Sequence, residues 1–492
     1  MIAMKKTIKI IDLFAGPGGL GEGFSSYSLN KSTPFKIAIS IEKEPFAHQT
    51  LSLRSFYRQF KSAPSEYYDY IQGKIDREKL FSLFPKQALK VEKETWQAEL
   101  GGENFPHKIV VDKIRSQISK NEECILIGGP PCQAYSLVGR SKMGKRDGFQ
   151  SDPRHTLYKE YLNIIGEFKP SIFVMENVKG ILSSKLNGEL IFNQILDDLK
   201  NPQKAINPER VRFRKGDTYS IYSFVTGKET EAGNSKDFVI KSEEYGIPQA
   251  RHRVILLGIR NDITATPEPL SKQEETVNVK DVIKDLPRLR SGLSKLEDNH
   301  DNWEQEIKKH NNSAEVYPSL SRGDNFIKSN TIPKTYCDWY YDPKLGGVLN
   351  HETRSHISAD LHRYHYIASY AQKKSVSPKL EDLPVKLLPK HKNVKAAIGK
   401  KSLFNDRFRV QKASSPATTI TSHISKDGHY FIHYDPKQCR SLTVREAARI
   451  QTFPDNYKFE GPRTSQYHQV GNAVPPLLAK KIAEVVYALL ET

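Results

Sequence analysis

The chain has 492 residues, which is more than one ordinary domain core holds and suggests two domains. Hydrophobic residues make up 37% of the sequence and charged residues 27%, a balance that excludes a disordered chain and is typical of a soluble globular protein. The formal net charge of +18 favours a polyanionic partner, but composition alone does not separate this from a solvated basic surface.

The four cysteines are scattered along the chain, at Cys124, Cys132, Cys337 and Cys439. None of them forms a CxxC pair or a Cys/His cluster of the kind that zinc needs, so we expect no metal and no disulfide framework. Such sparse cysteine usage is typical of a reducing cytosol. Since we find neither a membrane-span pattern nor a signal peptide, we expect a cytoplasmic protein that makes no membrane contact.

Apolar runs that alternate with amphipathic segments predict an α/β fold, in which helices cover a mostly parallel, Rossmann-like sheet. A first strand is expected over residues 5–12, followed by a glycine-rich turn and a helix that begins near Leu20. Further strands are expected over residues 35–42, 107–112, 124–129, 171–177 and 253–259. Open sheets of this kind bind ligands at the carboxyl ends of their strands, so the polar residues at those ends are candidate site residues.

The strand–helix alternation stops near Asn261, and the segment that follows is rich in basic, aromatic and Pro residues. Regular structure returns at the capping box formed by Thr443 and Glu446, and the chain ends in an amphipathic helix that should pack back on the first domain. The predicted organisation has three parts. They are a first domain over 1–265 with an insertion at about 51–107, a second, smaller and irregular domain over 266–438, and a return segment over 439–492 that completes the first domain.

The turn after the first strand contains the pattern G-x-G-x-x-G at Gly16, Gly18 and Gly21, which lets the backbone approach a nucleotide-like ligand closely. Alone this is a weak signal, because an NAD enzyme would show it too. Glu42, at the end of the second expected strand, is placed to accept hydrogen bonds from ribose hydroxyls. Asp112, at the end of the third, could accept one from an exocyclic amine. For either carboxylate considered singly, a strand-end cap is the simpler role.

Cys132 has the most specific surroundings of the four cysteines. Two prolines, Pro130 and Pro131, fix the backbone immediately before it and hold its sulfur beyond a strand end. A thiol so placed can serve as a nucleophile if neighbouring cations or amides lower its pKa. The other cysteines are expected to be inert.

Two further motifs place chemistry at the same edge of the sheet. Glu176 ends the fifth expected strand, where its carboxyl group could donate a proton to a ring nitrogen. Arg251 and Arg253 are two residues apart on an expected strand, so both should project to one face, where two guanidinium groups suit a carbonyl oxygen or a phosphate. A structural salt bridge is the alternative role for each arginine.

Taken together, the motifs resemble those of the cytosine-5 DNA methyltransferases and occur in that family's order. They are DLFAGPGG from Asp12, GGPPCQAYS around Cys132, ENVKG from Glu176, QARHR from Gln249, LTVREAARIQTFP from Leu442 and QVGNAVPP from Gln469. The resemblance covers both ends of the chain. It leaves the middle region as the family's variable target-recognition domain.

By this resemblance Cys132 is the nucleophile that attacks C6 of cytosine, and Glu176 binds N3 and the exocyclic amine of the base. Arg253 resembles the arginine that holds the base carbonyl, with Arg251 as a helper. The resemblance also implies S-adenosylmethionine as the methyl donor, converted to S-adenosylhomocysteine, and no metal. The implied cofactor-binding residues are Phe14, Ala15, Gly16, Gly18, Leu20, Glu42, Asp112, Pro131, Leu157 and Asn472.

The implied partner is double-stranded DNA, from which the target cytosine must swing out to reach the site. Nine Lys and Arg against one acid between residues 386 and 412 would supply phosphate contacts. The family's bacterial members imply a modification enzyme of a restriction–modification system, with a cognate restriction endonuclease that acts independently. We expect a monomer, associated with the nucleoid in the cytoplasm.

Three alternatives stay open at this point. The tRNA-directed branch of the same family shares the fold, but its members tend to have a shorter recognition region. A Rossmann oxidoreductase would bind NAD(P) and would leave the prolines before Cys132 unexplained. A catalytically silent DNA-binding homologue is disfavoured by the intact set of Cys132, Glu176 and Arg253.

Overall fold

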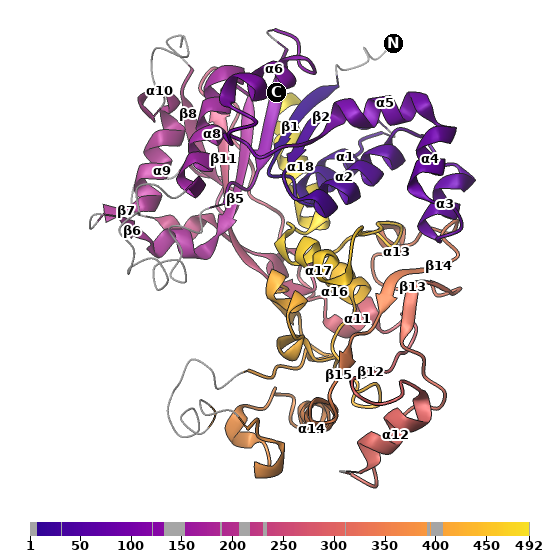
Figure 1. Cartoon of the computed structure of the whole chain (residues 1–492). Helices are drawn as coiled ribbons and strands as arrows, with labels where there is room; N and C mark the ends of the chain where they lie inside the picture. The colour runs from indigo at the N-terminus through magenta and orange to yellow at the C-terminus, as the bar shows by residue number, and fades with distance from the viewer. Residues whose placement is uncertain are drawn as a thin grey trace.

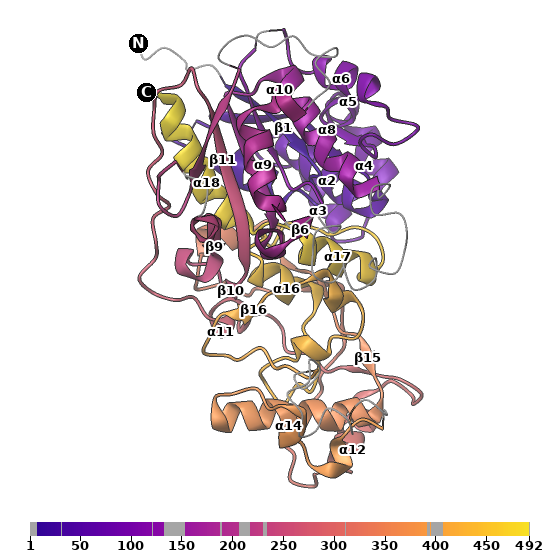
Figure 2. The same ribbon diagram turned by 90° about the vertical axis from the view of Figure 1, so that its left-hand side faces the viewer.

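The computed structural model describes residues 7–30, 32–120, 122–131, 153–186, 189–205, 217–229, 234–309, 311–390, 394 and 407–491. Cys132 and much of the basic 386–412 segment lie outside these ranges. Figure 1 shows a sheet-containing upper lobe and a lower lobe of short strands and helices, and Figure 2 shows the same two lobes from the side. Within the described residues, no helix has the length and apolar character needed to span a bilayer.

The upper lobe is built on one large sheet whose strands have the order β3-β2-β1-β4-β5-β11-β8, with β9 paired to β11. β3, β2, β1, β4 and β5 run parallel, whereas β11 is antiparallel to β5, β8 and β9. The mostly parallel α/β fold expected from the sequence is therefore confirmed. The strands are β1 (Ile8–Leu13), β2 (Phe35–Glu42), β3 (Thr95–Gln97), β4 (Cys124–Gly128), β5 (Ile172–Val178), β8 (Tyr219–Ser223), β9 (Val239–Lys241) and β11 (His252–Arg260).

The strand expected over residues 107–112 is wrong: these residues begin the helix α6 (His107–Arg115). Val110, Val111 and Ile114 are its buried residues, a spacing that fits one helical face, and Pro106 occupies the N-cap. A short apolar run does not by itself separate a buried strand from a buried helix face. Asp112 consequently lies exposed on a helix and not at a strand end. The third parallel strand is β3, inside the expected insertion.

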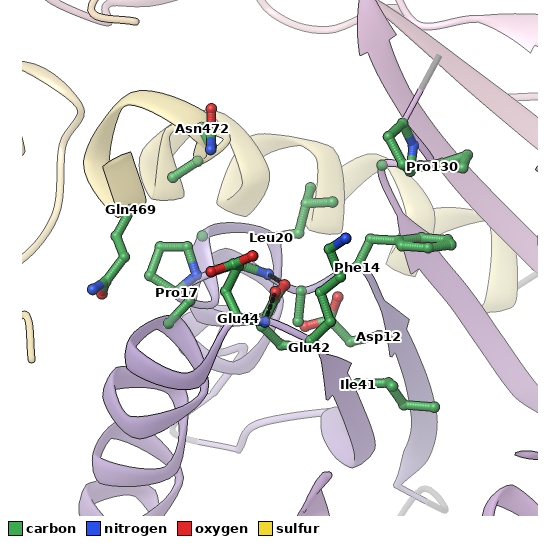
Figure 3. Close-up of a pocket in the computed structure, with 18 of the residues that line it drawn as sticks. Asp12, Phe14, Pro17, Leu20, Ile41, Glu42, Glu44, Pro130, Gln469 and Asn472 are labelled. Carbon is green, nitrogen blue, oxygen red and sulfur yellow. Dashed lines mark hydrogen bonds between the residues drawn. The ribbon is translucent and has the colours of Figure 1, made fainter. Parts of the chain in front are cut away.

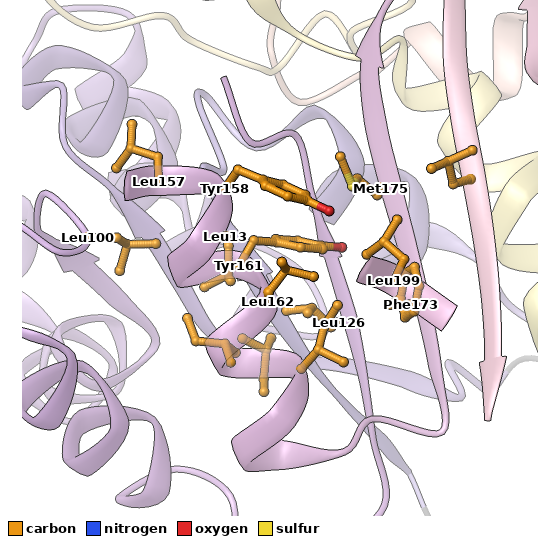
Figure 4. Packing of buried hydrophobic residues seen from close by; sticks show 14 of the residues in the cluster. Leu13, Leu100, Leu126, Leu157, Tyr158, Tyr161, Leu162, Phe173, Met175 and Leu199 are labelled. Carbon is orange, nitrogen blue, oxygen red and sulfur yellow. The ribbon is translucent and has the colours of Figure 1, made fainter. Parts of the chain in front are cut away.

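Helices cover both faces of the sheet and bury an apolar cluster on each. On one face α8 (Pro153–Phe168), α9 (Ile191–Lys200) and α6 pack over β4 and β5, and Figure 4 shows Tyr158, Tyr161 and Leu162 of α8 lying on this layer. On the other face α1 (Gly19–Ser26) packs against α18 (Pro476–Glu491), the last helix of the chain. The expectation that the last helix returns to the first domain is thus confirmed.

The lower lobe has a core of its own, in which Trp303, Leu361, Tyr364 and Ile367 are buried. Its parallel pair β10–β16 lies beside the start of β11 and so connects the two lobes near Arg251. The helices and strands from β10 onward, β11 and α18 apart, are β10 (Gln249–Ala250), α11 (Val279–Ile283), β12 (Gly292–Leu293), α12 (His300–Lys308), β13 (Gly323–Lys328), α13 (Cys337–Tyr340), β14 (Gly347–Glu352), β15 (Ser355–His356), α14 (Ser358–Lys374), β16 (Ala417–Thr418), α16 (Val444–Ile450) and α17 (Arg463–Asn472).

Short elements complete the described chain. They are β6 (Lys185–Leu186), β7 (Glu189–Leu190), α10 (Pro202–Ala205) and the 3₁₀ turns η3 (Lys179–Ser183), η4 (Ser235–Phe238), η5 (Ser242–Tyr245), η6 (Leu380–Asp382), η7 (Val385–Leu387), η8 (Ser422–Ser425) and η9 (His429–Phe431).

The segment between β2 and β3 forms four helices that brace the two lobes against each other. They are α2 (Pro45–Arg58), α3 (Ser65–Ile71), α4 (Arg77–Leu83) and α5 (Pro85–Glu94). The Tyr68 hydroxyl donates to Asp342 Oδ2 at 2.8 Å, and Lys344 Nζ donates to Ser62 Oγ at 2.7 Å. Leu345 is buried in the same apolar cluster as these helices. The angle between the lobes is therefore held by packed side chains as well as by the chain connections.

A buried ion pair stabilises the start of α16. The capping box expected at Thr443 and Glu446 is present, and Arg440 adds two hydrogen bonds to the Glu446 carboxylate, at 2.6 and 2.7 Å. Both side chains of the ion pair are about 1% exposed. The Arg440 guanidinium holds the pKa of Glu446 below its usual range in spite of the burial, which acts in the opposite direction.

We predict that Arg440→Met destabilises the protein by about 3–5 kcal/mol, because the Glu446 carboxylate is left buried without its cation. The free energy of unfolding in urea, measured at pH 7 for the wild type and for Arg440→Met, checks this prediction. Lys437→Met is the control, since Lys437 pairs at the surface with the exposed Glu315 and should matter little. A loss no larger than that of the control would contradict the prediction.

Candidate active site

A cavity of about 620 Å³ opens where the parallel strands end. Residues at or just beyond the carboxyl ends of β1, β2, β3, β4 and β5 form its floor. Figure 3 shows Gln469 and Asn472 of α17 opposite the strand-end residues Asp12 and Glu42. This is the position at which open α/β sheets bind their ligands.

The glycine-rich turn after β1 forms one wall of the cavity. Gly16 has a φ of +57°, and a Cβ placed there would meet no atom within 4 Å, so its backbone faces open space. Gly18 has a φ of +99° at the N-cap of α1, where a Cβ would lie 2.9 Å from Leu51 Cδ1. Gly18 does not line the cavity, and its lack of a side chain serves the packing of the turn against α2. Phe14 also adopts a positive φ, of 55°.

Glu42 fixes this turn from the end of β2. Its Oε2 accepts the N–H of Gly16 at 2.8 Å, and its Oε1 accepts the N–H of Glu44 at 2.7 Å. Burial raises the pKa of this carboxyl, while the two backbone donors act in the opposite direction. Since a carboxylate accepts about four hydrogen bonds, Glu42 keeps acceptor capacity for hydroxyl donors in the cavity.

Asp12 lines the cavity and was missed by the sequence analysis, although a carboxyl group at the end of an apolar strand is itself a signal. It is 1% exposed, and Ser40 Oγ donates to its Oδ2 at 3.3 Å. Its Oδ1 is buried and has no hydrogen-bond partner among the residues that the structure describes. Burial raises the pKa of Asp12 to about 7. An unpaired buried carboxylate oxygen in a cavity fits a cationic or N–H-bearing ligand.

Glu176 and Arg253 form an ion pair across the antiparallel strands β5 and β11. Arg253 Nε lies 2.9 Å from Glu176 Oε1, and both side chains are mostly buried. Glu176 lines the cavity. Arg253 is not among the lining residues, and its Nη1 donates to the backbone oxygen of His252 at 3.0 Å. The guanidinium therefore holds the carboxyl group in place.

Arg251 was expected on the same strand as Arg253, but it lies one residue before β11, which begins at His252. Arg251 is 1% exposed, and its Nη1 donates to the backbone oxygens of Ile420 at 2.8 Å and Gly471 at 3.1 Å. Burial lowers its pKa well below the usual value, with Arg253 acting in the same direction. The structure places Arg251 at the junction between β11, the 417–425 segment and α17, and outside the cavity lining.

The cavity brings together most of the residues that the sequence singled out. Its lining includes Phe14, Ala15, Gly16, Leu20, Glu42, Pro131, Leu157, Glu176 and Asn472. Gly18, Asp112, Arg251 and Arg253 do not line it, and Cys132 lies outside the described residues, directly after the lining residue Pro131. Glu99, just beyond β3, lies where Asp112 was expected. No group of three or more His, Cys, Asp or Glu side chains could hold a metal ion in the described part of the chain.

The chain matches the family model described as C-5 cytosine-specific DNA methylase over residues 84–203 and 234–488. It is 35% identical over 499 aligned residues to the type II methyltransferase M.Bpa9945I of Bacillus paralicheniformis, covering 97% of this chain and 98% of that protein. It is 27% identical to the type II methyltransferase M.DdeI of Desulfomicrobium norvegicum, covering 97% and 88%.

Among solved structures, the chain is similar in fold to a protein described as a prophage-encoded DNA modification methyltransferase of E. coli. The TM-score is 0.50 and the identity 18%, and the match covers 99% of this chain and 100% of the other.

We predict that Asp12→Asn stabilises the ligand-free protein at pH 8. The pKa of Asp12 is about 7 in the folded protein against 3.8 for a free side chain, so the wild type loses stability as the pH rises from about 4 to about 7. The gain should be roughly 1–4 kcal/mol, since one pKa unit corresponds to about 1.4 kcal/mol. Urea unfolding of both proteins from pH 4 to pH 8 measures it. A difference that does not grow with pH would count against the prediction.

Proposed function

We infer the function from one premise: this chain belongs to the C-5 cytosine-specific DNA methylase family and is a DNA cytosine-5 methyltransferase. We propose that the cavity at the strand ends binds S-adenosylmethionine and the extruded target cytosine side by side. The observation that carries this proposal is the convergence of Glu42, Glu176 and Pro131 on one cavity, since Pro131 directly precedes Cys132.

The chemistry of the cavity suits the parts of the cofactor. Glu42 would accept hydrogen bonds from the ribose hydroxyls, and the unpaired Oδ1 of Asp12 would accept the cationic amino group. The apolar walls from Phe14, Leu20 and Leu157 would exclude water around the sulfonium. When bound, S-adenosylmethionine supplies a methyl group on a positively charged sulfur. Ala15, Gly16, Pro131 and Asn472 complete the proposed contacts, and Gly18 contributes through the shape of the turn.

Glu176 would hold the cytosine by its N3 and exocyclic amine, oriented by the ion pair with Arg253. The Cys132 thiolate would then add to C6, so that the electron pair of the C5–C6 double bond moves to C5. C5 would form a bond to the methyl carbon while the bond from that carbon to the sulfonium sulfur breaks. Loss of the C5 proton to a base or to water restores the double bond and expels the thiolate.

The lower lobe is proposed to read the DNA sequence. The apolar core within residues 293–439 suits a recognition domain over about 266–438. A second core, which joins segments 277–286 and 417–431 to α16 and α17, would attach this domain to a catalytic part formed by 1–265 and 439–492. The net charge of +18 supports a duplex DNA substrate. We also propose that the enzyme acts as a monomer in the cytoplasm, near the nucleoid, beside an independent cognate endonuclease. The two relatives reported above are type II methyltransferases. This similarity favours a DNA substrate over the tRNA-directed alternative.

We predict that Cys132→Ala abolishes methylation, because the covalent route to an electron-rich C5 is lost. Bisulfite sequencing of DNA from an expression host should show 5-methylcytosine at one sequence with the wild type and none with the variant. The affinity for S-adenosylmethionine, measured by calorimetry, should change less than threefold. Residual methylation at more than about a hundredth of the wild-type rate would rule out the covalent mechanism, and transfer into tRNA alone would rule out the DNA substrate.

We predict that Glu42→Ala weakens S-adenosylmethionine binding at least tenfold, since the variant loses both the ribose acceptor and the anchor of the Gly16 turn. Asp112→Ala is the matched control: it removes an exposed carboxyl group on α6 and should leave the affinity unchanged. Calorimetric titration of each variant with the cofactor distinguishes the two. Equal losses in both variants would show that the cofactor site is misplaced.

A further inference from the structure

We propose that Asn177 is a positioning residue, which holds the backbone that leads into Cys132 at a fixed place beside Glu176. The inference rests on the proposed function, because it assigns Cys132 the role of nucleophile. It goes beyond that function by naming a residue of the cavity lining whose side-chain amide bonds to the backbone before Cys132 and so controls the approach of the sulfur.

The parallel pairing between β4 and β5 ends too early to fix this backbone. The last paired residues are Gly128 and Met175, and the chain then continues through Gly129, Pro130 and Pro131. A proline has no backbone N–H, so two in succession cannot extend a strand ladder. Some other group must hold the link between the strand and Cys132.

The Asn177 side chain supplies this contact from the neighbouring strand. Its Nδ2 donates to the backbone oxygen of Pro130 at 3.0 Å, and the side chain is buried. Its Oδ1 accepts the N–H of Val178 at 2.9 Å, which fixes the amide plane and sets which end of the amide donates. The two bonds together need one donor and one acceptor on a short side chain, and an asparagine provides both.

Glu176 contacts the same link one residue earlier. A Cβ at Gly129 would lie 3.0 Å from Glu176 Oε2, so the carboxyl group packs directly on this glycine. Adjacent residues of β5 thus contact adjacent residues of the link, Glu176 at Gly129 and Asn177 at Pro130. The carboxyl group proposed to hold the base and the amide that fixes the backbone before the sulfur therefore come from adjacent residues of one strand.

This coupling has a kinetic consequence. The attack of the sulfur on C6 depends on a separation of about 3–3.5 Å, and a displacement of about 1 Å can cost roughly a hundredfold in rate. Loss of the Asn177 contact should therefore slow the formation of the covalent bond. It should leave the binding of cofactor and DNA nearly intact, because the Asn177 amide bonds to backbone groups, at Pro130 and Val178, on both its nitrogen and its oxygen.

The test compares Asn177→Ala and Asn177→Asp with the wild-type enzyme. The aspartate keeps the size of the side chain and the acceptor for Val178 but lacks the donor for Pro130. Asn261→Ala is the matched control, because it removes a side-chain amide bond of 2.7 Å to Thr218 beyond the other end of the antiparallel strand β11. Each protein is mixed with S-adenosylmethionine and with duplex DNA that carries 5-fluorocytosine at the mapped target. After methyl transfer the enzyme stays covalently attached to this base, because C5 then carries fluorine and has no proton to lose.

We expect both Asn177 variants to form the detergent-stable complex 10 to 100 times more slowly than the wild type under single-turnover conditions. Their dissociation constants for S-adenosylmethionine and for the unmodified duplex should change less than threefold, and Asn261→Ala should match the wild type throughout. Normal trapping rates in both Asn177 variants would overturn the inference about Asn177 and leave the proposed function standing. So would a slow rate accompanied by equal losses of cofactor and DNA affinity, since these would indicate general structural damage. Failure of the wild type to form any complex would instead overturn the proposed function.

Discussion

The structure depends on one constraint: parallel strands bring their carboxyl ends to the same edge of the sheet. Asp12, Glu42 and Glu176 come from three different strands, yet they line one cavity because β2, β1, β4 and β5 are neighbours. The prolines that precede Cys132 follow β4 at the same edge. Burial on both faces fixes the register of the sheet, and the register fixes where each polar group lies.

The strands could be predicted from the sequence where apolar runs ended in a turn motif, as at β1, β2, β4 and β5. The run at 107–112 was misassigned because its valines suit a helix face equally well, and the true third strand, β3, is only three residues long. Arg251 was expected on a strand and lies one residue before β11. Asp12 ends an apolar strand, which is a signal in the sequence, but only the folded structure shows that its carboxyl group is buried. Such features depend on tertiary packing, which no local pattern contains.

The helices between β2 and β3 are the part of the fold that sequence patterns described least. These helices separate β2 from β3 along the chain, but the two strands still pair as neighbours in the sheet. They contact the lower lobe through the bonds from Tyr68 to Asp342 and from Lys344 to Ser62, and through the apolar cluster that includes Leu345. For the proposed function, which needs an extruded base held against a nucleophile, a fixed angle between the two lobes is an advantage. In this account the insertion contributes to that rigidity.

The central claim is that one cavity presents a bound cytosine to the sulfur of Cys132. Peptide mapping by mass spectrometry of the complex between the wild-type enzyme and 5-fluorocytosine DNA tests it most directly. The account predicts a single nucleotide adduct on the peptide that contains Cys132. An adduct on a peptide that contains Cys124, Cys337 or Cys439, or methylated DNA released with no adduct at all, would contradict it.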